Sequence, residues 1–96
     1  MANVVLARSA QARLESLISS HSLPDTTRDR VRASLEHLGA FPLIGSPLTG
    51  GWEGFRFILG PWPWMLLVYL YDEGADVVMV VTIQDARSAR SAMSQR

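Results

Sequence analysis

The sequence predicts an α+β domain in which a helical hairpin packs on a small, mainly antiparallel sheet. Three observations lead to this prediction: a β-branched segment near the N-terminus, two following segments with helical periodicity, and three apolar segments separated by short turns. Apolar residues that recur at helical spacing indicate amphipathic helices, whereas short apolar runs between turn residues indicate strands. The predicted element order is therefore β-α-α-β-β-β.

The N-terminal half supplies the first strand and both helices. Val4–Leu6 is β-branched and apolar, and we expect it to form a strand. Ser9 is the expected N-cap of a first helix, for which Ala10–Ser20 is predicted, because a serine hydroxyl can accept from a free amide of the first turn. The helix prediction depends on four apolar residues that share one face: Ala10, Leu14, Leu17 and Ile18.

The second helix is predicted over Thr26–Leu38. Its N-cap is expected at Asp25 or Thr26, and Gly39 is a natural residue to follow a helix end. The prediction depends on the i, i+4, i+7 spacing of three apolar residues: Val31, Leu35 and Leu38.

The C-terminal half changes to strand patterning. Phe41–Gly54 is rich in glycine and proline and is predicted to be a loop, and the tail Asp85–Arg96 is expected to fray or to form a short helix on docking. Short polar or Gly/Pro-containing turns join the three remaining strands into an antiparallel meander. These strands are predicted over Phe55–Leu59, Trp64–Tyr71 and Val77–Ile83.

Length and composition set limits on what the protein can be. The chain has 96 residues, which is enough for one domain spanning 1–96, and its formal net charge is +0. It has no cysteine, and its two histidines lack ligand spacing, so we expect neither a metal site nor a cofactor. The longest apolar run, Trp62–Tyr71, is about half the ~20 residues that a membrane helix needs, and no secretory signal precedes it. We therefore expect a cytoplasmic protein without membrane contact.

All nine basic residues are arginines, and there is no lysine. Arginine is a planar donor suited to carboxylates and phosphates, but it stays protonated and cannot act as a general base. The absence of lysine excludes any chemistry that needs a lysine side chain. The balanced charge also argues against strong nonspecific binding to nucleic acid.

The last two predicted strands are apolar on both faces. Met65–Val68 and Val77–Val81 are continuous apolar runs rather than alternating ones, as in strands that are covered on both sides. The two helices can cover one face of the sheet. The other face must meet the C-terminal tail, a second copy, another protein, or the loop Phe41–Gly54 folded back over it.

Short motifs in this order resemble the RelE/ParE superfamily of type II toxin–antitoxin toxins. The strand Val4–Leu6 followed by Ser9-Ala10 resembles the family's "(L/S)xxA" helix start. The segment from Leu35 through Gly54 resembles its "LxxxPxxGxxLxG" linker, and Phe55–Gly60 resembles its "(L/F)RxxxxG" strand. Two more segments match the family's last strands: Trp64–Glu73, similar to "YRxxYxxD", and Val77–Arg87, similar to a strand ending in "DxR". The resemblance covers nearly the whole chain.

The sequence also departs from the family pattern. Leu66 stands where the "YRxxY" motif has its arginine, and the Gly60–Trp64 turn is longer and carries two prolines. Gln84–Ala86 stands where many relatives carry histidine, and no tyrosine follows Arg87. These departures concern the residues that RelE-like members use for chemistry.

The resemblance implies two different activities. RelE-like members cleave mRNA on the ribosome, a reaction that needs cations for the phosphate and groups for proton transfer. ParE-like members inhibit DNA gyrase by binding and need no catalytic residues of their own. The chain has no lysine, and no histidine after His37, that could serve the nuclease reaction. We therefore favour a ParE-like toxin that is no enzyme, with the ribosome-dependent endoribonuclease as the alternative. A non-toxic homodimeric interaction module is the third hypothesis.

Both toxin activities imply a cognate antitoxin, whose acidic, partly disordered segment folds on the toxin to give a hetero-oligomer.

The candidate catalytic residues are Arg56, Arg87 and Tyr69, and further groups for proton transfer are Tyr71, Glu53 and Asp85. Arg56 either binds phosphate or a carboxylate, or lies with its stem on Trp52 or Trp64. We expect Trp64 in the core and Trp62 at the surface or in an interface. The candidate partner-binding residues are Arg56, Trp62, Trp64, Arg87 and Arg90.

Overall fold

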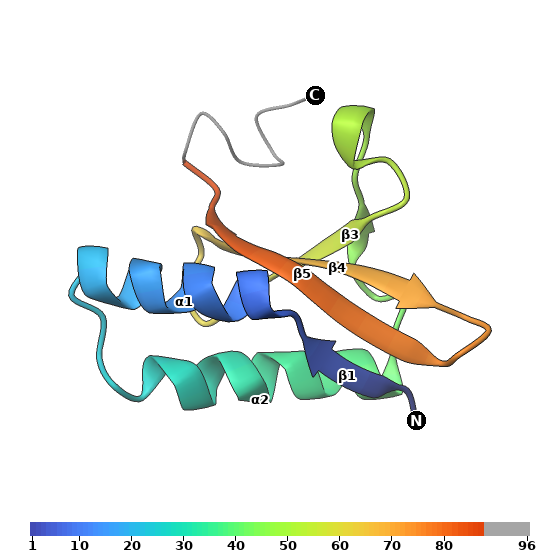
Figure 1. Ribbon diagram of the computed structural model, residues 1–96, viewed down its shortest axis with the longest axis horizontal. Helices are drawn as coiled ribbons and strands as arrows, with labels where there is room; N and C mark the ends of the chain where they lie inside the picture. The colour runs from blue at the N-terminus through green and yellow to red at the C-terminus, as the bar shows by residue number, and fades with distance from the viewer. Residues whose placement is uncertain (88–96) are drawn as a thin grey trace.

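A five-stranded mixed sheet with two helices on one face forms the structure, a computed structural model that describes residues 1–87 (Figure 1). The strand order is β1-β5-β4-β3-β2, with β1 parallel to β5 and every other pair antiparallel. This confirms the predicted fold class and element order. The elements are β1 (Asn3–Leu6), α1 (Arg8–Ser20), α2 (Thr27–Ala40), β2 (Ser46–Pro47), the 3₁₀ turn η1 (Gly50–Trp52), β3 (Arg56–Leu59), β4 (Met65–Asp72) and β5 (Val77–Asp85).

The first helix begins earlier than the sequence predicts. α1 starts at Arg8, and its N-cap residue is Ala7, without a side-chain cap. The Ala7 amide donates to the Val80 carbonyl of β5 (2.9 Å), so the pairing of β1 with β5 continues up to the residue before the helix. The Ser9 hydroxyl donates instead to the Val81 carbonyl (2.8 Å). The prediction of Ser9 as N-cap is therefore wrong, because its hydroxyl ties α1 to the sheet.

The second helix runs past its predicted end. Gly39 lies inside α2, which extends to Ala40, and it is buried. A Cβ at this position would lie 3.2 Å from the Ala2 carbonyl oxygen. The Ala2 amide also donates to the Gly39 carbonyl (2.8 Å). Gly39 therefore permits the close approach of α2 to the N-terminus, rather than ending the helix.

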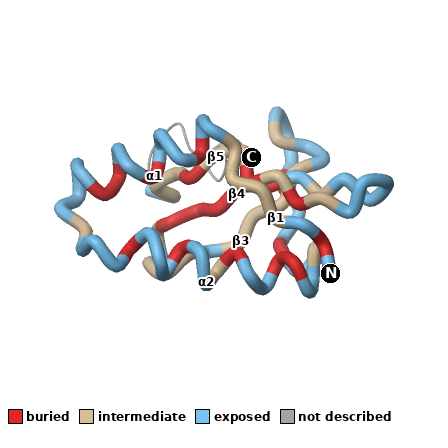
Figure 2. Tube along the Cα trace, turned by 60° about the horizontal axis from the view of Figure 1, so that its bottom comes forward, coloured by how far each residue is buried: buried red, intermediate tan, exposed pale blue. Residues whose placement is uncertain are grey.

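The main core lies between the helices and the sheet. Register places Val4 opposite Val78, Leu6 opposite Val80, and Tyr69 opposite Val80, so these side chains share the face that the helices cover. The central strand β4 is buried over its first half, as the red tube in Figure 2 shows. The helices contribute their predicted apolar faces to this core: Ala10, Leu14, Leu17 and Ile18 from α1, and Val31, Leu35 and Leu38 from α2.

The second face of the sheet is covered over one half by the loop that precedes β3. Leu66 and Val68 of β4 are fully buried there, and they pack with Leu48 from that loop. Trp52, Phe55 and Phe57 complete this smaller core. The predicted loop Phe41–Gly54 therefore contains two short elements, β2 and η1, and folds over this half of the face.

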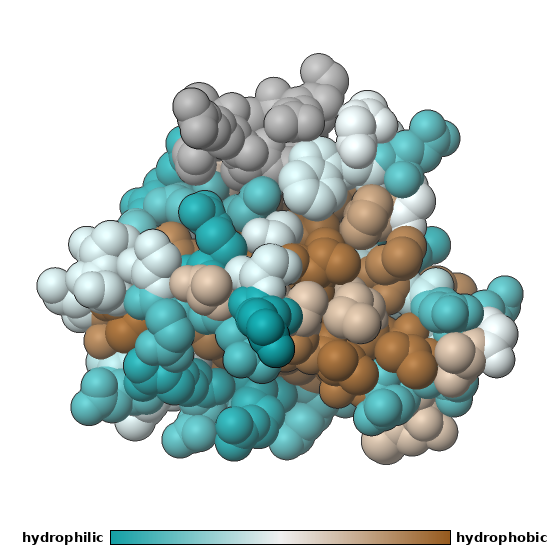
Figure 3. Space-filling view, viewed as in Figure 1, coloured by the Kyte–Doolittle hydropathy of each residue, from teal (hydrophilic) through white to brown (hydrophobic). Residues whose placement is uncertain are grey.

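The other half of the second face is open. Val5, Leu70, Val77 and Met79 share this face by register, and each is at least partly exposed. Leu70 is 40% exposed. Figure 3 shows an apolar area over the strands, beside the helices. A β-bulge between Val68 and Tyr69 separates the covered half of β4 from the open half.

The last strand is longer than the sequence predicts. β5 continues to Asp85, so the predicted tail begins later than the sequence indicates. Its segment 88–96, including Arg90, lies outside the described residues. Within residues 1–87, neither helix is long and apolar enough to cross a membrane.

Candidate functional site

Two of the predicted catalytic residues hold the loop that precedes β2. Arg56 and Tyr69 are directly opposite each other in the β3–β4 ladder. The Arg56 guanidinium donates to the Gly45 carbonyl (2.7 Å) and, at 3.3 Å, to the Leu43 carbonyl. The Gly45 amide donates to the Tyr69 hydroxyl (2.9 Å). The Arg56 guanidinium and the Tyr69 hydroxyl are therefore both hydrogen-bonded to backbone groups. We call Gly45, Arg56 and Tyr69 together the Gly45 clasp.

The clasp leaves no space for a side chain at residue 45. A Cβ there would lie 2.6 Å from the Tyr69 hydroxyl and 2.7 Å from the Phe57 carbonyl oxygen. Tyr69 is fully buried, and this burial raises the pKa of its hydroxyl. A buried phenol with a raised pKa is a poor proton acceptor at neutral pH. The geometry therefore gives Tyr69 a structural task in the described chain.

A second polar cluster forms where β5 ends, beside the turn that precedes β4. The Trp64 ring stacks on the His21 ring, with centroids 4.7 Å apart and planes inclined by 17°. The Arg87 guanidinium lies 4.9 Å from the centroid of the same indole. Asp85 accepts from Arg87 through both oxygens (2.9 Å each) and lies 3.2 Å from the His21 imidazole. We call these four residues the Trp64 cluster.

Asp85 is the electrostatic centre of the Trp64 cluster. Hydrogen bonds from the Arg87 side chain and backbone, with a smaller contribution from His21, outweigh burial and hold the pKa of the Asp85 carboxyl well below its ordinary value. The Asp85 side chain is 17% exposed, whereas that of Arg87 is 62% exposed. Arg87 is thus oriented by Asp85 and Trp64 while its outer edge faces solvent, where an anion can reach it.

Trp62 lies deeper than the sequence predicts. Its ring is half-buried against the main core, and its indole nitrogen is buried. The Arg30 guanidinium of α2 lies 4.7 Å from the ring centroid. Trp64 is also half-buried against this core, as expected for that residue. The two tryptophans therefore join the β3–β4 turn to the connected end of the helical hairpin, where α1 ends at Ser20 and α2 begins at Thr27.

Sequence reasoning missed His21 and Arg30 as members of these contacts. His21 follows the end of α1 and Arg30 lies in α2, neither belongs to a motif, and their partners are about 30 to 64 positions away, as the His21–Asp85 hydrogen bond illustrates. The remaining candidates lie apart from the two clusters. Tyr71 donates to Asp76 (2.7 Å), and this bond is the main cause of the raised pKa of the Tyr71 hydroxyl. Glu53 is exposed at the end of η1.

In the Trp64 cluster the described residues place an oriented, exposed cation, Arg87, beside the His21–Asp85 pair. Arg87 can bind a phosphate or a carboxylate, while both tyrosine hydroxyls are engaged with other groups. No group of three or more His, Asp or Glu side chains within residues 1–87 is arranged to hold a metal ion.

The fold can be compared with solved structures. The isolated E. coli RelE toxin superposes with a TM-score of 0.64 at 18% identity, over 94% of this chain and 89% of that chain. The intact E. coli RelBE toxin–antitoxin complex matches with a TM-score of 0.65 at 18% identity, covering 92% of this chain and 100% of that chain. The RelBE2 toxin–antitoxin complex of Mycobacterium tuberculosis gives 0.60 at 21% identity, over 88% and 96%.

This chain has the RelE fold. At the level of the fold, the match confirms the resemblance that the order of motifs indicates. No protein-family model and no curated protein matches the sequence. Within the RelE fold, Leu66 is buried under the loop before β3. The departure from the "YRxxY" pattern therefore contributes to a second core rather than to a polar site.

Replacing Gly45 tests the clasp. We expect Gly45→Ala to lower the free energy of unfolding by about 1–3 kcal/mol, because its Cβ must displace Tyr69 or the β3 backbone. Gly74→Ala is the control, since a Cβ there meets only an Asp72 oxygen at 3.5 Å and should change stability by less than about 0.5 kcal/mol. Urea unfolding followed by circular dichroism measures both. Equal effects of the two substitutions would contradict the clasp.

The pH dependence of stability tests the Trp64 cluster. Folding lowers the pKa of Asp85, so its contribution is complete above the ordinary value of 3.8 and is lost as the pH falls from there toward the folded-state pKa. We expect Asp85→Asn to cost about 1–3 kcal/mol at pH 7, and the difference from the unmodified chain to shrink below pH 4. Urea unfolding between pH 7 and pH 2.5 measures this, with the exposed Glu73→Gln as control. A difference that does not vary with pH would exclude this role for Asp85.

Proposed function

We propose that this chain is the toxin of a type II toxin–antitoxin pair. The observation that carries the proposal is the RelE fold over nearly the whole chain, since the structures that share it include an isolated toxin and two toxin–antitoxin complexes. The open half of the second sheet face supports it. Val5, Leu70, Val77 and Met79 form an apolar surface on a chain of only 96 residues, and such a surface is typical of a partner-binding site (Figure 3).

The partner in this proposal is a cognate antitoxin with an acidic, partly disordered segment. Such a segment gains enough apolar contact to fold only when it binds. Its carboxylates would pair with Arg87, which is exposed and already oriented by Asp85. Trp62 and Trp64 are other proposed contacts near this end of the sheet, and Arg90, which lies outside the described residues, is a further proposed contact. The expected assembly is a toxin–antitoxin hetero-oligomer in the cytoplasm.

For the free toxin we propose an action on the ribosome, as an mRNA endonuclease. The similarity to RelE structures favours this target over gyrase, against the expectation drawn from the missing sequence motifs. Arg87 is the candidate group for the phosphate, because it is the exposed cation of the Trp64 cluster. Proton transfer would then fall to groups other than Arg56 and Tyr69, since the clasp engages both.

Gyrase inhibition by binding is the second candidate, and a specific observation favours it. The polar residues at the sheet are bonded to the chain's own backbone, and Leu66 fills the position of the motif arginine in an apolar core. A toxin that acts only by binding needs no acid–base pair.

Pulse labelling after induction of this chain alone in a bacterial host decides between the targets. We expect methionine incorporation to stop before thymidine incorporation. Arg87→Ala should weaken the effect about tenfold, because a charge-assisted hydrogen bond to phosphate is worth about 1.5–3 kcal/mol. Arg87→Lys should retain part of the activity, and Arg13→Ala, on the exposed side of α1, should retain all of it.

The other outcomes are equally informative. An early stop in thymidine incorporation would replace the ribosome with gyrase as the target. Undisturbed growth with a folded, well-expressed chain would overturn the toxin proposal and leave a non-toxic interaction module. The urea unfolding of Arg87→Ala shows whether loss of activity reflects loss of the site or loss of the fold.

A further inference from the structure

The end of α1 holds His21 beside β5. Ser22, the next residue, has a φ of 51°, in the left-handed region that glycine adopts most readily. The Leu23 amide then donates to the Ile18 carbonyl (3.0 Å). The Ser22 amide donates to the Ser19 carbonyl (3.4 Å), and the two bonds together form the Schellman arrangement of a helix end. His21 is therefore the C-cap residue of a well-defined helix end, from which its side chain reaches β5.

The two ring nitrogens of His21 have different partners. Nε2 lies 3.2 Å from an Asp85 oxygen, and Nδ1 lies 2.9 Å from the Ser20 hydroxyl. Asp85 is ionised at neutral pH, because hydrogen bonds from Arg87 hold the pKa of its carboxyl well below the ordinary value. An ionised carboxylate only accepts hydrogen bonds. In the neutral ring, Nε2 therefore carries the proton and Nδ1 presents its lone pair to the Ser20 hydroxyl.

The Nδ1 edge of the imidazole is accessible. The His21 side chain is 30% exposed, and Ser20 is an exposed residue. The Ser20 hydroxyl bonds only to its neighbour in the chain, so a rotation of its side chain releases Nδ1 at little cost. A hydroxyl of a bound molecule can then take its place at this nitrogen.

One carboxylate oxygen connects the imidazole to the exposed cation of the Trp64 cluster. Asp85 Oδ2 accepts from Arg87 Nη2 (2.9 Å) and lies 3.2 Å from His21 Nε2. These two nitrogens are therefore no further apart than the two hydrogen bonds laid end to end. The Trp64 indole contacts both side chains as well. A phosphate oxygen at Arg87 and a hydroxyl at His21 can thus belong to one nucleotide.

The charged group that faces the imidazole is the Asp85 carboxylate, which Arg87 also binds. The other neighbours are neutral, since the turn before β4 contributes the Trp64 ring and α1 contributes the Ser20 hydroxyl. Asp85 can therefore stabilise the positive charge that the ring gains with a proton, as a carboxylate does beside a histidine that acts as a general base.

We infer that His21 accepts the proton of the attacking hydroxyl in phosphodiester cleavage, while Arg87 binds the phosphate. This inference rests on the proposed function and names the proton acceptor of that same site. The ribose 2′-oxygen forms a bond to phosphorus, the bond from phosphorus to the 5′-oxygen breaks, and the 2′-hydroxyl proton passes to Nδ1 of His21. The departing 5′-oxygen takes a proton from water, and His21 returns its proton to solvent. The products are a 2′,3′-cyclic phosphate and a 5′-hydroxyl end.

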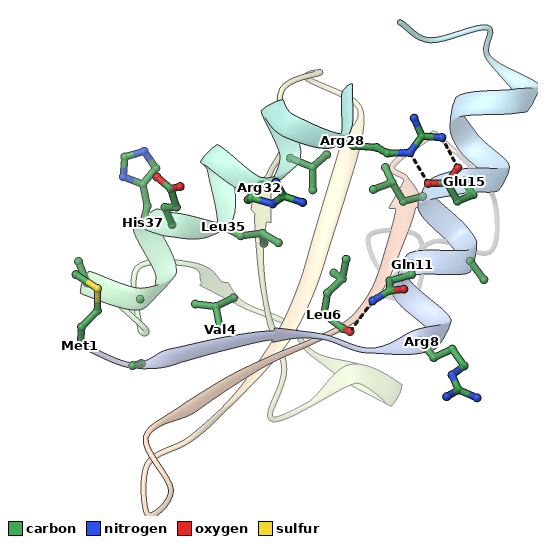
Figure 4. A pocket seen from close by; sticks show the side chains of 17 residues that line it. Met1, Val4, Leu6, Arg8, Gln11, Glu15, Arg28, Arg32, Leu35 and His37 are labelled. Carbon is green, nitrogen blue, oxygen red and sulfur yellow. Dashed lines mark hydrogen bonds and ion pairs between the residues drawn. The ribbon is translucent and has the colours of Figure 1, made fainter. Parts of the chain in front are cut away.

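Cleavage of mRNA on ribosomes tests the proton acceptor with the purified full-length chain. Single-turnover rates are measured between pH 5.5 and pH 8.5. We expect His21→Gln to lower the rate at pH 7 about a hundredfold or more, and to remove the rise of the rate with pH. His37→Gln is the matched control, because His37 is exposed and lines the groove between the helices and β1 (Figure 4). It should leave the rate and its pH profile unchanged.

Added imidazole separates a chemical role from a structural one. We expect His21→Ala to lose cleavage and to recover about tenfold when imidazole is added, because the free ring can occupy the space beside Trp64. Asp85 is a positioning residue in this inference. Asp85→Asn should lower the rate less than His21→Gln and move the midpoint of the pH profile to lower pH, since the protonated ring loses its carboxylate. Urea unfolding shows whether each variant is folded.

A second measurement needs no variant. The chain has two histidines, so NMR can follow the imidazole signals of His21 and His37 separately on the unmodified chain. A dinucleoside phosphate with a 2′-hydroxyl should shift the His21 signals and leave those of His37 in place. Its 2′-deoxy analogue should shift the His21 signals less. Equal shifts with both compounds, or none with either, would contradict a hydroxyl at Nδ1.

Failure of the inference and failure of the proposed function give different results. Cleavage by His21→Gln within about threefold of the unmodified rate, with the same pH profile, would overturn the role of His21 and retain the endonuclease. No recovery of folded His21→Ala with imidazole would likewise reduce His21 to a structural residue. No cleavage by the unmodified chain would remove the endonuclease and the role of His21 together.

Discussion

The burial of β4 on both faces is the constraint on which the rest of the structure depends. Residues Met65–Tyr69 are five consecutive buried side chains in the middle of the sheet, so each face needs its own apolar cover. The helical hairpin supplies one cover, and the loop through Leu48 and Trp52 supplies half of the other. The remaining half, from Val5 to Met79, has no cover within the described residues. An uncovered apolar face of this kind is typical of a partner-binding surface.

The loop keeps its place through polar contacts with the strands. The Gly45 clasp joins it to β3 and β4 through Arg56 and the buried hydroxyl of Tyr69. These are two of the three residues that the sequence analysis proposes for catalysis, the third being Arg87. A side chain that completes a buried hydrogen-bond network is costly to withdraw, since its partners would be left unpaired. The clasp therefore limits the polar groups available for chemistry, and it makes Arg87 the main candidate cation of the described chain.

The two open surfaces differ in kind. The uncovered half of the second face offers apolar side chains, whereas a groove of about 1270 Å³ between the helices and β1 is lined by apolar and charged side chains together. Val5 contributes to the first surface, and its neighbours Val4 and Leu6 contribute to the second, because successive side chains of a strand point to opposite faces.

The sequence by itself determined the element order, the two amphipathic faces and the excess of apolar strand surface, because these depend on local periodicity. Resemblance to a family added the RelE-like fold. Only the tertiary structure decided the role of Ser9, the place of Gly39 inside α2, and the joining of His21 to Asp85 across 64 positions. It also decided that Arg56 and Tyr69 bind Gly45, and that the two helices diverge to leave a groove. These features depend on contacts between residues distant in sequence, and periodicity within one segment carries no information about them.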